Sequence, residues 1–222
     1  MVLLIFDLDD TLYKSRSLTK EVEKKIAAKY KDVANLPDDV DAISEFRRVR
    51  RERALSGKKT SATHIFGDHG VKREDFFQLL DSIDPRDHVE YDKKTHKMIK
   101  DLAEEHTLVL FSNSPRIRVD KTLEALKLAS YFTKIFGADD WHKSKPDPGI
   151  FKMIMEETGF RPEDTISIGD DVYKEILPSK NAGIKTVLVC QWPYTDEEKA
   201  QADCVIGHIH ELPEAVKSFI NK

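Results

Sequence analysis

Short, mostly apolar runs alternate with amphipathic stretches along much of the chain. Apolar runs of this kind are typical of strands that are buried on both faces of a parallel sheet. Five runs are predicted as strands: Val2–Phe6, Thr107–Phe111, Lys134–Phe136, Thr165–Ile168 and Lys185–Cys190. Because helical patterns separate most of them, the sequence predicts an α/β fold with a parallel sheet and right-handed crossovers.

Amphipathic helices are predicted where apolar residues recur every three or four positions. Between the later strands these stretches are Lys93–Glu105, Arg116–Ser130 and Gly149–Thr158. Asp147 and Pro148 fit an N-cap followed by a first helical residue, and Gly159 fits a helix end. Pro178 is expected to kink or delay the helix that follows the fourth strand.

The segment between the first and second strands contains no convincing strand. Its apolar spacing predicts helices only, at Leu18–Tyr30, Asp38–Leu55 and Arg73–Ile83. We therefore expect a core formed by residues 1–14 and 89–222, and a helical insertion of residues 15–88 that acts as a lid above the carboxyl ends of the sheet. Several arginines gather on the middle helix, where they form a solvated face with intrahelical ion pairs or contact the substrate: Arg47, Arg48, Arg50, Arg51 and Arg53.

Composition narrows the class of protein. The 222 residues suffice for one large domain or a domain with an insertion, and 40% hydrophobic residues support a full core. A formal net charge of −4 gives no basic field for a nucleic acid polymer or an anionic membrane. The first apolar run stops at Asp7, too early for a signal peptide, and no stretch predicts a membrane span. We expect a cytoplasmic protein, monomeric or a small homo-oligomer, with Cys190 and Cys204 as buried free thiols.

Carboxylates follow the first predicted strand directly, in the sequence Asp7-Leu8-Asp9-Asp10-Thr11. Side chains alternate along an extended chain, so Asp7 and Asp9 are expected to point the same way. Carboxylates this close repel each other. A divalent cation would relieve the repulsion, or one carboxyl is protonated and acts as an acid. By itself the motif also fits a strand followed by a polar turn.

Polar residues follow other predicted strands as well. Ser112 and Asn113 come after the second strand, where a hydroxyl and an amide bind phosphoryl oxygens or form only a turn. Lys145 lies in a loop stiffened by prolines, where its ammonium neutralises a carboxylate and a phosphate or lies at the surface. Asp170 and Asp171 follow the fourth strand and could complete a magnesium site. Since chemistry in open parallel sheets is found at the carboxyl ends of strands, the set points to one catalytic edge.

In the order of these residues the chain resembles the haloacid dehalogenase superfamily of phosphatases. The residues that carry the resemblance are Asp7-Leu8-Asp9-Asp10-Thr11, Ser112, Lys145 and Gly169-Asp170-Asp171. The resemblance extends over the whole chain, and the helical insertion resembles the C1-type cap of that family. It implies a Rossmann-like three-layer core, Mg2+ as the cofactor, and hydrolysis of a small phosphorylated metabolite.

The resemblance also implies a role for each residue. Asp7 would attack phosphorus and form an aspartyl-phosphate, while Asp9 would protonate the leaving oxygen and later take a proton from water. Lys145 would offset the charge of Asp7 and the phosphate. Mg2+ would be held by the Asp7 carboxylate, the Asp9 main-chain carbonyl and Asp170. Three further residues would bind or orient the phosphate: Thr11, Ser112 and Asn113.

The chain departs from the family pattern near its fourth motif. The family often has a second Asp five positions after Asp170, where this chain has Glu175. Either Asp171 or Glu175 is expected to support the metal site without binding the metal directly. Of the two, Asp171 is preferred.

Two other functions stay open on the sequence. Asp9 argues against dehalogenation, because family dehalogenases lack an Asp two positions after the nucleophile. A phosphomutase keeps this Asp and therefore remains an alternative. So does a catalytically silent binding or regulatory domain on the same fold.

Overall fold

The structure is a computed structural model that describes residues 1–56, 58, 59, 61–141 and 143–220. The chain divides into two compact units, one of Met1–Lys14 with Val89–Lys222 and the other of Ser15–His88. Each unit has its own hydrophobic core, so each is described by itself.

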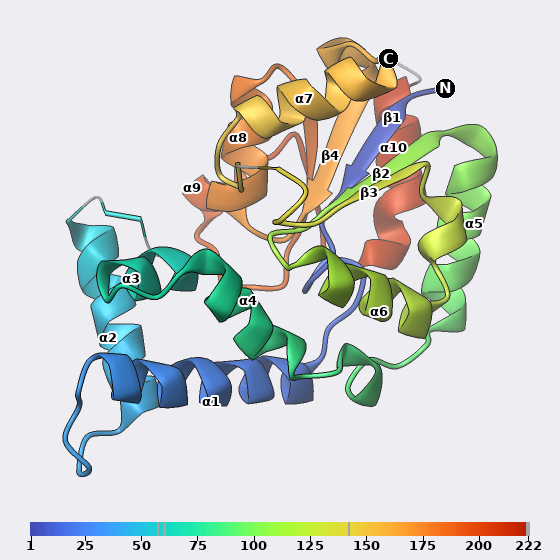
Figure 1. Cartoon of the computed structure of the whole chain (residues 1–222). Coiled ribbons are helices and arrows are strands. Elements are labelled where there is room, and N and C mark those ends of the chain that lie inside the picture. Colours follow the sequence, from blue (N-terminus) through green and yellow to red (C-terminus); the bar gives the residue numbers. More distant parts are fainter. Residues whose placement is uncertain (57, 60, 142, 221–222) are drawn as a thin grey trace. The chain divides into compact units, whose positions relative to one another are not determined.

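A parallel sheet of six strands forms the centre of the larger unit (Figure 1). Its strands are β1 (Leu3–Phe6), β2 (Thr107–Phe111), β3 (Lys134–Phe136), β4 (Thr165–Gly169), β5 (Lys185–Val189) and β6 (Cys204–Ile206). They pair in the order β3-β2-β1-β4-β5-β6, the order of a doubly wound Rossmann-like sheet. The predicted α/β fold with a parallel sheet is confirmed.

The five predicted strands are all present, and their ends shift by no more than one residue. The sixth strand, β6, was not among them. It has only three residues, and Val205 at its centre is 42% exposed, so the segment lacks the continuous burial that makes the other strands visible in the sequence.

Helices cover both faces of the sheet. They are α5 (Lys93–Glu105), α6 (Arg116–Leu126), α7 (Gly149–Thr158), α8 (Leu177–Asn181), α9 (Asp196–Lys199) and α10 (Leu212–Ile220). Ile5 of β1 packs with Phe151 of α7, whereas the next residue, Phe6, points to the opposite face and meets the ring of Phe132 at 5.7 Å between centroids. In Figure 1, α5 and α10 lie across the sheet from α7 and α8, which completes three layers.

Helix ends follow the expected caps in most places. Gly159 ends α7 with a φ of 74°, as predicted. At the other end Pro148 and not Asp147 is the N-cap, although the Gly149 N–H donates to the Asp147 carboxylate at 2.8 Å. Helix α6 ends at Leu126, earlier than predicted. Lys127 adopts a left-handed φ of 57°, and the N–H of Leu128 returns to the Leu123 carbonyl at 2.9 Å, which closes the helix.

The disturbance predicted at Pro178 takes the form of a π-helical turn, η4 (Val172–Ile176), that precedes α8. The N–H of Leu177 bonds to the carbonyl of Val172, five residues back. Proline has no N–H to continue this pattern, so the wide turn stops and α8 begins. This turn places Glu175 in the site described below.

The smaller unit contains helices only, within the residues that the structure describes. They are α1 (Arg16–Val33), α2 (Ala42–Leu55), α3 (Ala62–Asp68) and α4 (Arg73–Asp81), of which α3 was not predicted. Aromatic rings form its core, with centroid distances of 5.1 Å for Tyr30–Phe46, 6.0 Å for Phe46–Phe66 and 5.2 Å for Phe66–Phe76. This separate core explains why an insertion of this length folds as a compact body.

Three of the arginines on α2 form ion pairs inside this unit. Arg47 donates to Glu23 through two nitrogens at 2.8 Å, Arg48 binds carboxylates one turn before and after it on the same helix, and Arg53 pairs with Asp68. These contacts favour the interpretation of a solvated face over a substrate role.

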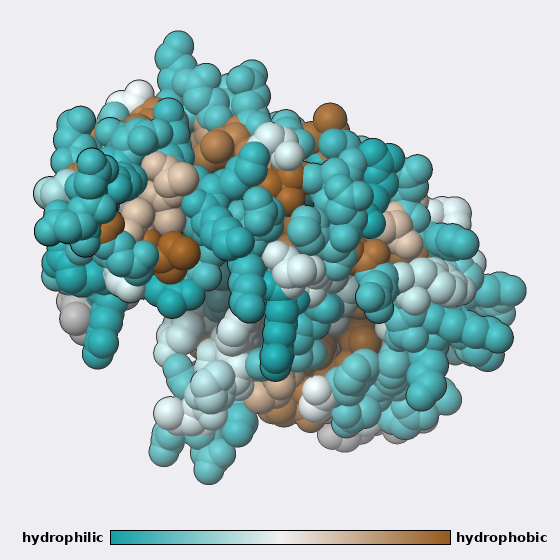
Figure 2. All heavy atoms as spheres, turned by 90° about the horizontal axis from the view of Figure 1, so that it is seen from below, coloured by the Kyte–Doolittle hydropathy of each residue, from teal (hydrophilic) through white to brown (hydrophobic). Residues whose placement is uncertain are grey.

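The surface is largely polar. Figure 2 shows hydrophilic side chains over most of one face, with apolar ones scattered among them. Among the described residues no helix is long and apolar enough to cross a bilayer. Cys190 and Cys204 are not joined by a disulfide, and both are half-buried rather than fully buried as predicted.

Candidate active site

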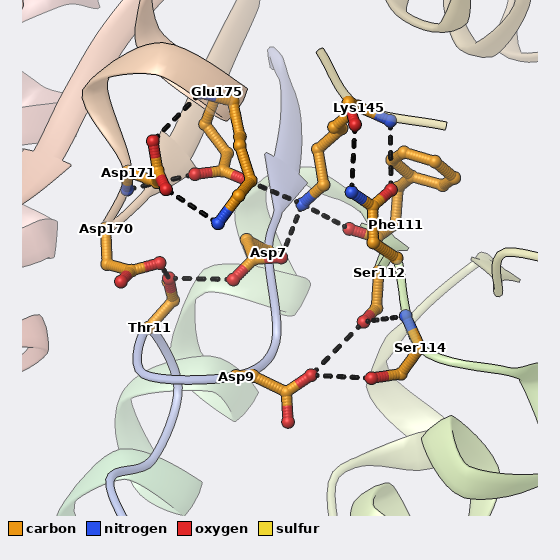
Figure 3. Close-up of polar contacts among 12 residues, drawn as sticks. Asp7, Asp9, Thr11, Phe111, Ser112, Ser114, Lys145, Asp170, Asp171 and Glu175 are labelled. Carbon is orange, nitrogen blue, oxygen red and sulfur yellow. Dashed lines mark hydrogen bonds and ion pairs between the residues drawn. The ribbon is translucent and has the colours of Figure 1, made fainter. Parts of the chain in front are cut away.

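The predicted catalytic residues of the larger unit gather at the carboxyl ends of β1, β2 and β4 (Figure 3). Neighbouring strands β1 and β4 lie where the strand order reverses, the place where open α/β sheets bind ligands. The N–H of Asp7 donates to the Ile168 carbonyl at 2.9 Å, so Asp7 leaves the sheet beside the end of β4. Parallel register therefore brings together residues that are far apart in the sequence.

Asp7 lies at the centre of this arrangement and is 8% exposed. One of its carboxylate oxygens accepts a hydrogen bond from the Lys145 ammonium, and the other accepts one from the Thr11 hydroxyl at 3.1 Å. The same hydroxyl lies 3.4 Å from Oδ1 of Asp170. The structure thus brings four predicted residues together around one buried carboxylate.

Lys145 reaches the site from the loop before α7, and its side chain is 3% exposed. Its ammonium pairs with Asp7, lies 3.0 Å from a carboxylate oxygen of Glu175, and donates to the Phe111 carbonyl at 3.1 Å. Burial by itself lowers the pKa of Lys145, but the charges of Asp7 and Glu175 outweigh burial and raise the pKa above its usual value. The lysine is therefore held as a fixed cation and not as a surface residue.

Asn113 holds Lys145 in place through its main chain. Its side-chain nitrogen donates to the Lys145 carbonyl at 3.0 Å, and its side-chain oxygen accepts from the Lys145 N–H at 2.9 Å. Both ends of the amide are therefore used within the protein. The predicted role in binding phosphate has no support from these contacts.

Glu175, and not Asp171, enters the site. Glu175 is 4% exposed, pairs with Lys145, and accepts from the Asp171 N–H at 2.9 Å. Burial raises its pKa and the charge of Lys145 partly opposes this effect. Gly169 makes room for it, since a Cβ there would lie 2.5 Å from Glu175 Cγ.

The Asp171 carboxylate points elsewhere. It accepts from the N–H groups of Tyr173 and Lys174 at the start of η4, at 2.9 and 3.0 Å, and its other oxygen lies 2.7 Å from the Lys174 ammonium. It is an N-cap of the π-helical turn. The preference for Asp171 over Glu175 therefore does not agree with the contacts.

Asp9 turns away from Asp7 toward the loop after β2. One of its oxygens accepts from Ser114 at 2.9 Å and lies 3.4 Å from Ser112 Oγ, and the other accepts from the Tyr13 hydroxyl. The expectation that Asp7 and Asp9 point the same way assumed an extended chain. Strand β1 ends at Phe6, and the chain turns through Asp10 with a φ of 58°, so the two carboxylates have different partners.

Asp170 is held by residues that follow β5. The Trp192 indole N–H donates to its Oδ2 at 2.6 Å, and the Tyr194 hydroxyl donates to its main-chain carbonyl at 3.2 Å. Burial and, after it, the negative charge of Asp7 raise the pKa of Asp170. A buried carboxylate whose pKa is raised by a second one beside it fits a site for a divalent cation with oxygen ligands.

The fit to a metal depends on main-chain oxygen as well as side chains. Among the described residues, His, Cys, Asp and Glu side chains do not form a group of three or more that could hold a metal ion. Asp7 and Asp170 offer two carboxylates, so the main-chain carbonyl of Asp9, predicted above, is needed as a third protein ligand.

Several contacting residues were not given a site role from the sequence. Ser114 follows directly on Ser112 and Asn113, and Trp192 follows β5, so the position after a strand end was a usable signal for both. His210 lies away from these residues and contacts Asp92 and Thr95, at 2.9 and 3.0 Å, while His142 lies outside the described residues.

Comparison with known proteins identifies relatives over nearly the whole chain. The family model described as haloacid dehalogenase-like hydrolase matches residues 4–189. A glyceraldehyde 3-phosphate phosphatase of Methanocaldococcus jannaschii is 25% identical and aligns over 97% of each chain. Among solved structures, a HAD phosphatase of Thermococcus onnurineus matches with a TM-score of 0.72 at 19% identity over 97% of this chain and 98% of its own. The hydrolase YfnB of Bacillus subtilis, solved with bound magnesium and described as revealing interdomain movement, matches with a TM-score of 0.66 at 19% identity over 97% of this chain and 98% of its own.

Proposed function

The chain belongs to the haloacid dehalogenase-like hydrolases, and we propose that it is a magnesium-dependent phosphatase that hydrolyses a small phosphomonoester through an aspartyl-phosphate on Asp7. The observation that carries this proposal is the buried contact between Asp7 and Lys145 at the point where the strand order reverses. A carboxylate held against a fixed ammonium is oriented beside a compensating charge, as suits a nucleophile at phosphorus.

The proposed reaction has two steps. An oxygen of Asp7 forms a bond to phosphorus while the bond to the leaving oxygen breaks, and Asp9 gives that oxygen its proton. Water then attacks the aspartyl-phosphate, Asp9 takes a proton from the water, and Asp7 and inorganic phosphate are released. Lys145 and Ser112 bind the phosphoryl oxygens through charge and a hydroxyl.

To act as the acid, Asp9 must break some of the hydrogen bonds that it now accepts. Its carboxylate is satisfied by the hydroxyls of Ser114 and Tyr13 and does not face Asp7. We propose that these hydroxyls hold Asp9 ready beside the site. A rotation of its side chain then exchanges them for the substrate.

We assign the metal to Asp7, Asp170 and the main-chain carbonyl of Asp9. Bound Mg2+ would supply charge neutralisation for the phosphoryl oxygens. Trp192 fixes one oxygen of Asp170 and leaves Oδ1 for the metal. The Thr11 hydroxyl, at 3.4 Å, is the one hydrogen-bond partner of Oδ1 among the described residues. Glu175 supports the site through Lys145, and Asn113 positions Lys145.

The helical unit, residues 15–88, is proposed to select the substrate as a lid that moves about connections near residues 14–17 and 88–91. Its separate aromatic core supports movement as a rigid body. Structures with and without a phosphate analogue would test this proposal, and an identical angle between the units in both would refute it. The cytoplasmic location and the monomeric or small homo-oligomeric state stay predictions.

The deciding experiment is a screen of phosphorylated metabolites with magnesium, followed by substitution of the nucleophile. Asp7→Asn is expected to abolish turnover and to leave far-UV circular dichroism unchanged. Asp101→Asn is a matched control, because Asp101 is an exposed carboxylate that pairs only with Lys97 among the described residues. Retained hydrolysis in Asp7→Asn would refute the assignment.

The alternatives give different results in the same screen. A phosphomutase would require a bisphosphate activator and release little inorganic phosphate. A silent binding domain would bind magnesium, as seen by calorimetry, without turnover of any phosphate ester.

A further inference from the structure

Arg118, in the first turn of α6, is a buried arginine whose side chain has no counter-charge among the described residues. It is 7% exposed, and its Nε is buried with no hydrogen bond. Within the residues that the structure describes, its guanidinium forms no ion pair. Arg116, two positions earlier, differs in this respect: it binds Asp120 at 2.8 Å and the Ile135 carbonyl at 2.7 Å.

A guanidinium in this position needs an anion. Buried charges are normally paired, because the loss of hydration is costly without a compensating charge and hydrogen bonds. Arginine cannot escape the cost by losing its proton, since its pKa is too high. The described residues supply no such partner, and an anionic group on a ligand would provide one.

The location of α6 indicates which part of a ligand would lie there. The helix begins two residues after Ser114, whose hydroxyl donates to Asp9 at 2.9 Å (Figure 3). Tyr13 is the other donor to Asp9. Burial and the charge of Asp9 raise the pKa of the Tyr13 hydroxyl, and the positive charge of Arg118 opposes this rise. Arg118 is thus near enough to the Tyr13 hydroxyl to act on it through its charge, on the side of the site from which Asp9 is proposed to protonate the leaving group.

We propose that Arg118 binds a second anionic group, a carboxylate or a phosphate, on the leaving-group portion of the substrate. This inference rests on the proposed phosphatase function. It narrows the substrate class to phosphomonoesters that carry another negative charge besides the phosphate that is hydrolysed. Arginine suits such a group, because its planar donors match carboxylate and phosphate oxygens in pairs.

The test compares substrates that differ only in the second anion. 2-Phosphoglycolate and ethyl phosphate differ by a carboxylate in place of a methyl group, and propane-1,3-diol bisphosphate and propyl phosphate differ by a terminal phosphate. Wild-type protein is expected to prefer, in at least one pair, the substrate that carries a second anionic group. Which pair shows the preference indicates whether that group is a carboxylate or a phosphate. Arg118→Gln is expected to lower kcat/KM for the preferred substrate by about tenfold to a hundredfold, the effect of losing a hydrogen bond to a charged group. The kcat/KM for the matched substrate without the second anion should stay unchanged.

Two further variants make the result unambiguous. Arg116→Gln, on the same turn, is the matched control and should not change the preference. Arg118→Lys keeps the charge, loses the paired geometry and should give an intermediate preference. Thermal unfolding provides a second measurement: loss of an unpaired buried charge should leave the midpoint of Arg118→Gln equal to that of wild type or raise it.

Three results would overturn the inference: equal loss with both members of each pair, no preference in the wild type, or a lower unfolding midpoint in Arg118→Gln, which would reveal a structural partner. Absence of turnover with every substrate would instead refute the proposed phosphatase function.

Discussion

Substitution of Gly169 by alanine tests how closely the site is packed behind its nucleophile. A Cβ at this position would lie 2.5 Å from Glu175 Cγ and 2.7 Å from Glu175 Cβ. Carbon atoms in contact normally stand about 3.5–4.0 Å apart, so the new methyl group would overlap Glu175 by about 1 Å. Glu175 is 4% exposed and lies on the π-helical turn, which leaves it little room to withdraw.

The expected cost follows from the two ways in which the overlap can be relieved. If the surroundings shift, overpacking costs about 1–3 kcal/mol. If Glu175 swings out, Lys145 loses one of its two carboxylate partners, and breaking a buried ion pair costs about 3–5 kcal/mol. The cheaper route decides the outcome, so Gly169→Ala is expected to lower the free energy of unfolding by about 1–3 kcal/mol. It should also lower kcat, because Lys145 is less firmly held.

Urea unfolding followed by tryptophan fluorescence is a suitable assay, since Trp141 and Trp192 both belong to the larger unit. Gly67→Ala is the matched control: no atom lies within 4 Å of a Cβ there, and its helical position should make that variant as stable as wild type or slightly more stable in a companion measurement by circular dichroism. In a Glu175→Gly background both clashing carbon atoms are absent, so adding Gly169→Ala should cost less than about 0.5 kcal/mol. An equal cost with and without the Glu175 side chain would refute the reasoning.

Three other predictions follow from the same contacts. Lys145→Met leaves Asp7 buried without its cation, so it should lower the free energy of unfolding in urea by about 3–5 kcal/mol and abolish turnover. Unchanged stability would contradict the ion-pair assignment. Partial burial raises the pKa of Asp92, but the hydrogen bonds that its carboxylate accepts from Thr95 and other neighbours lower the pKa overall. The carboxylate therefore stabilises the fold above the unfolded pKa of Asp92, and this stabilisation is lost as the pH falls. Asp92→Ala should therefore cost about 1 kcal/mol at pH 7, and this difference should narrow below about pH 4; a constant difference would contradict it. Trp192→Phe removes the donor to Asp170 and should weaken magnesium binding about tenfold in calorimetric titration, with unchanged affinity as the opposing result.

Local sequence pattern was sufficient for five of the six strands and for helices α5 and α7 of the larger unit. Burial of strands on both faces and of helices on one face leaves a periodic signal, and α5 and α7 have the predicted ends. The pattern failed where burial is partial, as in β6, or where a single residue changes the backbone direction, as Lys127 does at the end of α6.

The position of the candidate site also follows from the sequence, because Asp7, Ser112 and Asp170 each come directly after a strand end and parallel strands end at one edge. The partners of each side chain do not follow in this way. On the sequence Asp171 is preferred to Glu175, and only the π-helical turn and the space at Gly169 bring Glu175 to Lys145.

Asn113 and Arg118 are two further residues whose side-chain contacts could not be predicted from the sequence. Asn113 was predicted as a phosphate ligand, but its amide binds the main chain of Lys145. Arg118 was given no role from the sequence, and only the structure shows it buried with no counter-charge among the described residues. The sequence by itself determined the elements and their order, since hydrophobic periodicity is a local property of neighbouring residues. Tertiary structure alone decided which charges meet, because an ion pair or hydrogen bond depends on strand register, backbone turns and side-chain orientation across long separations in the chain.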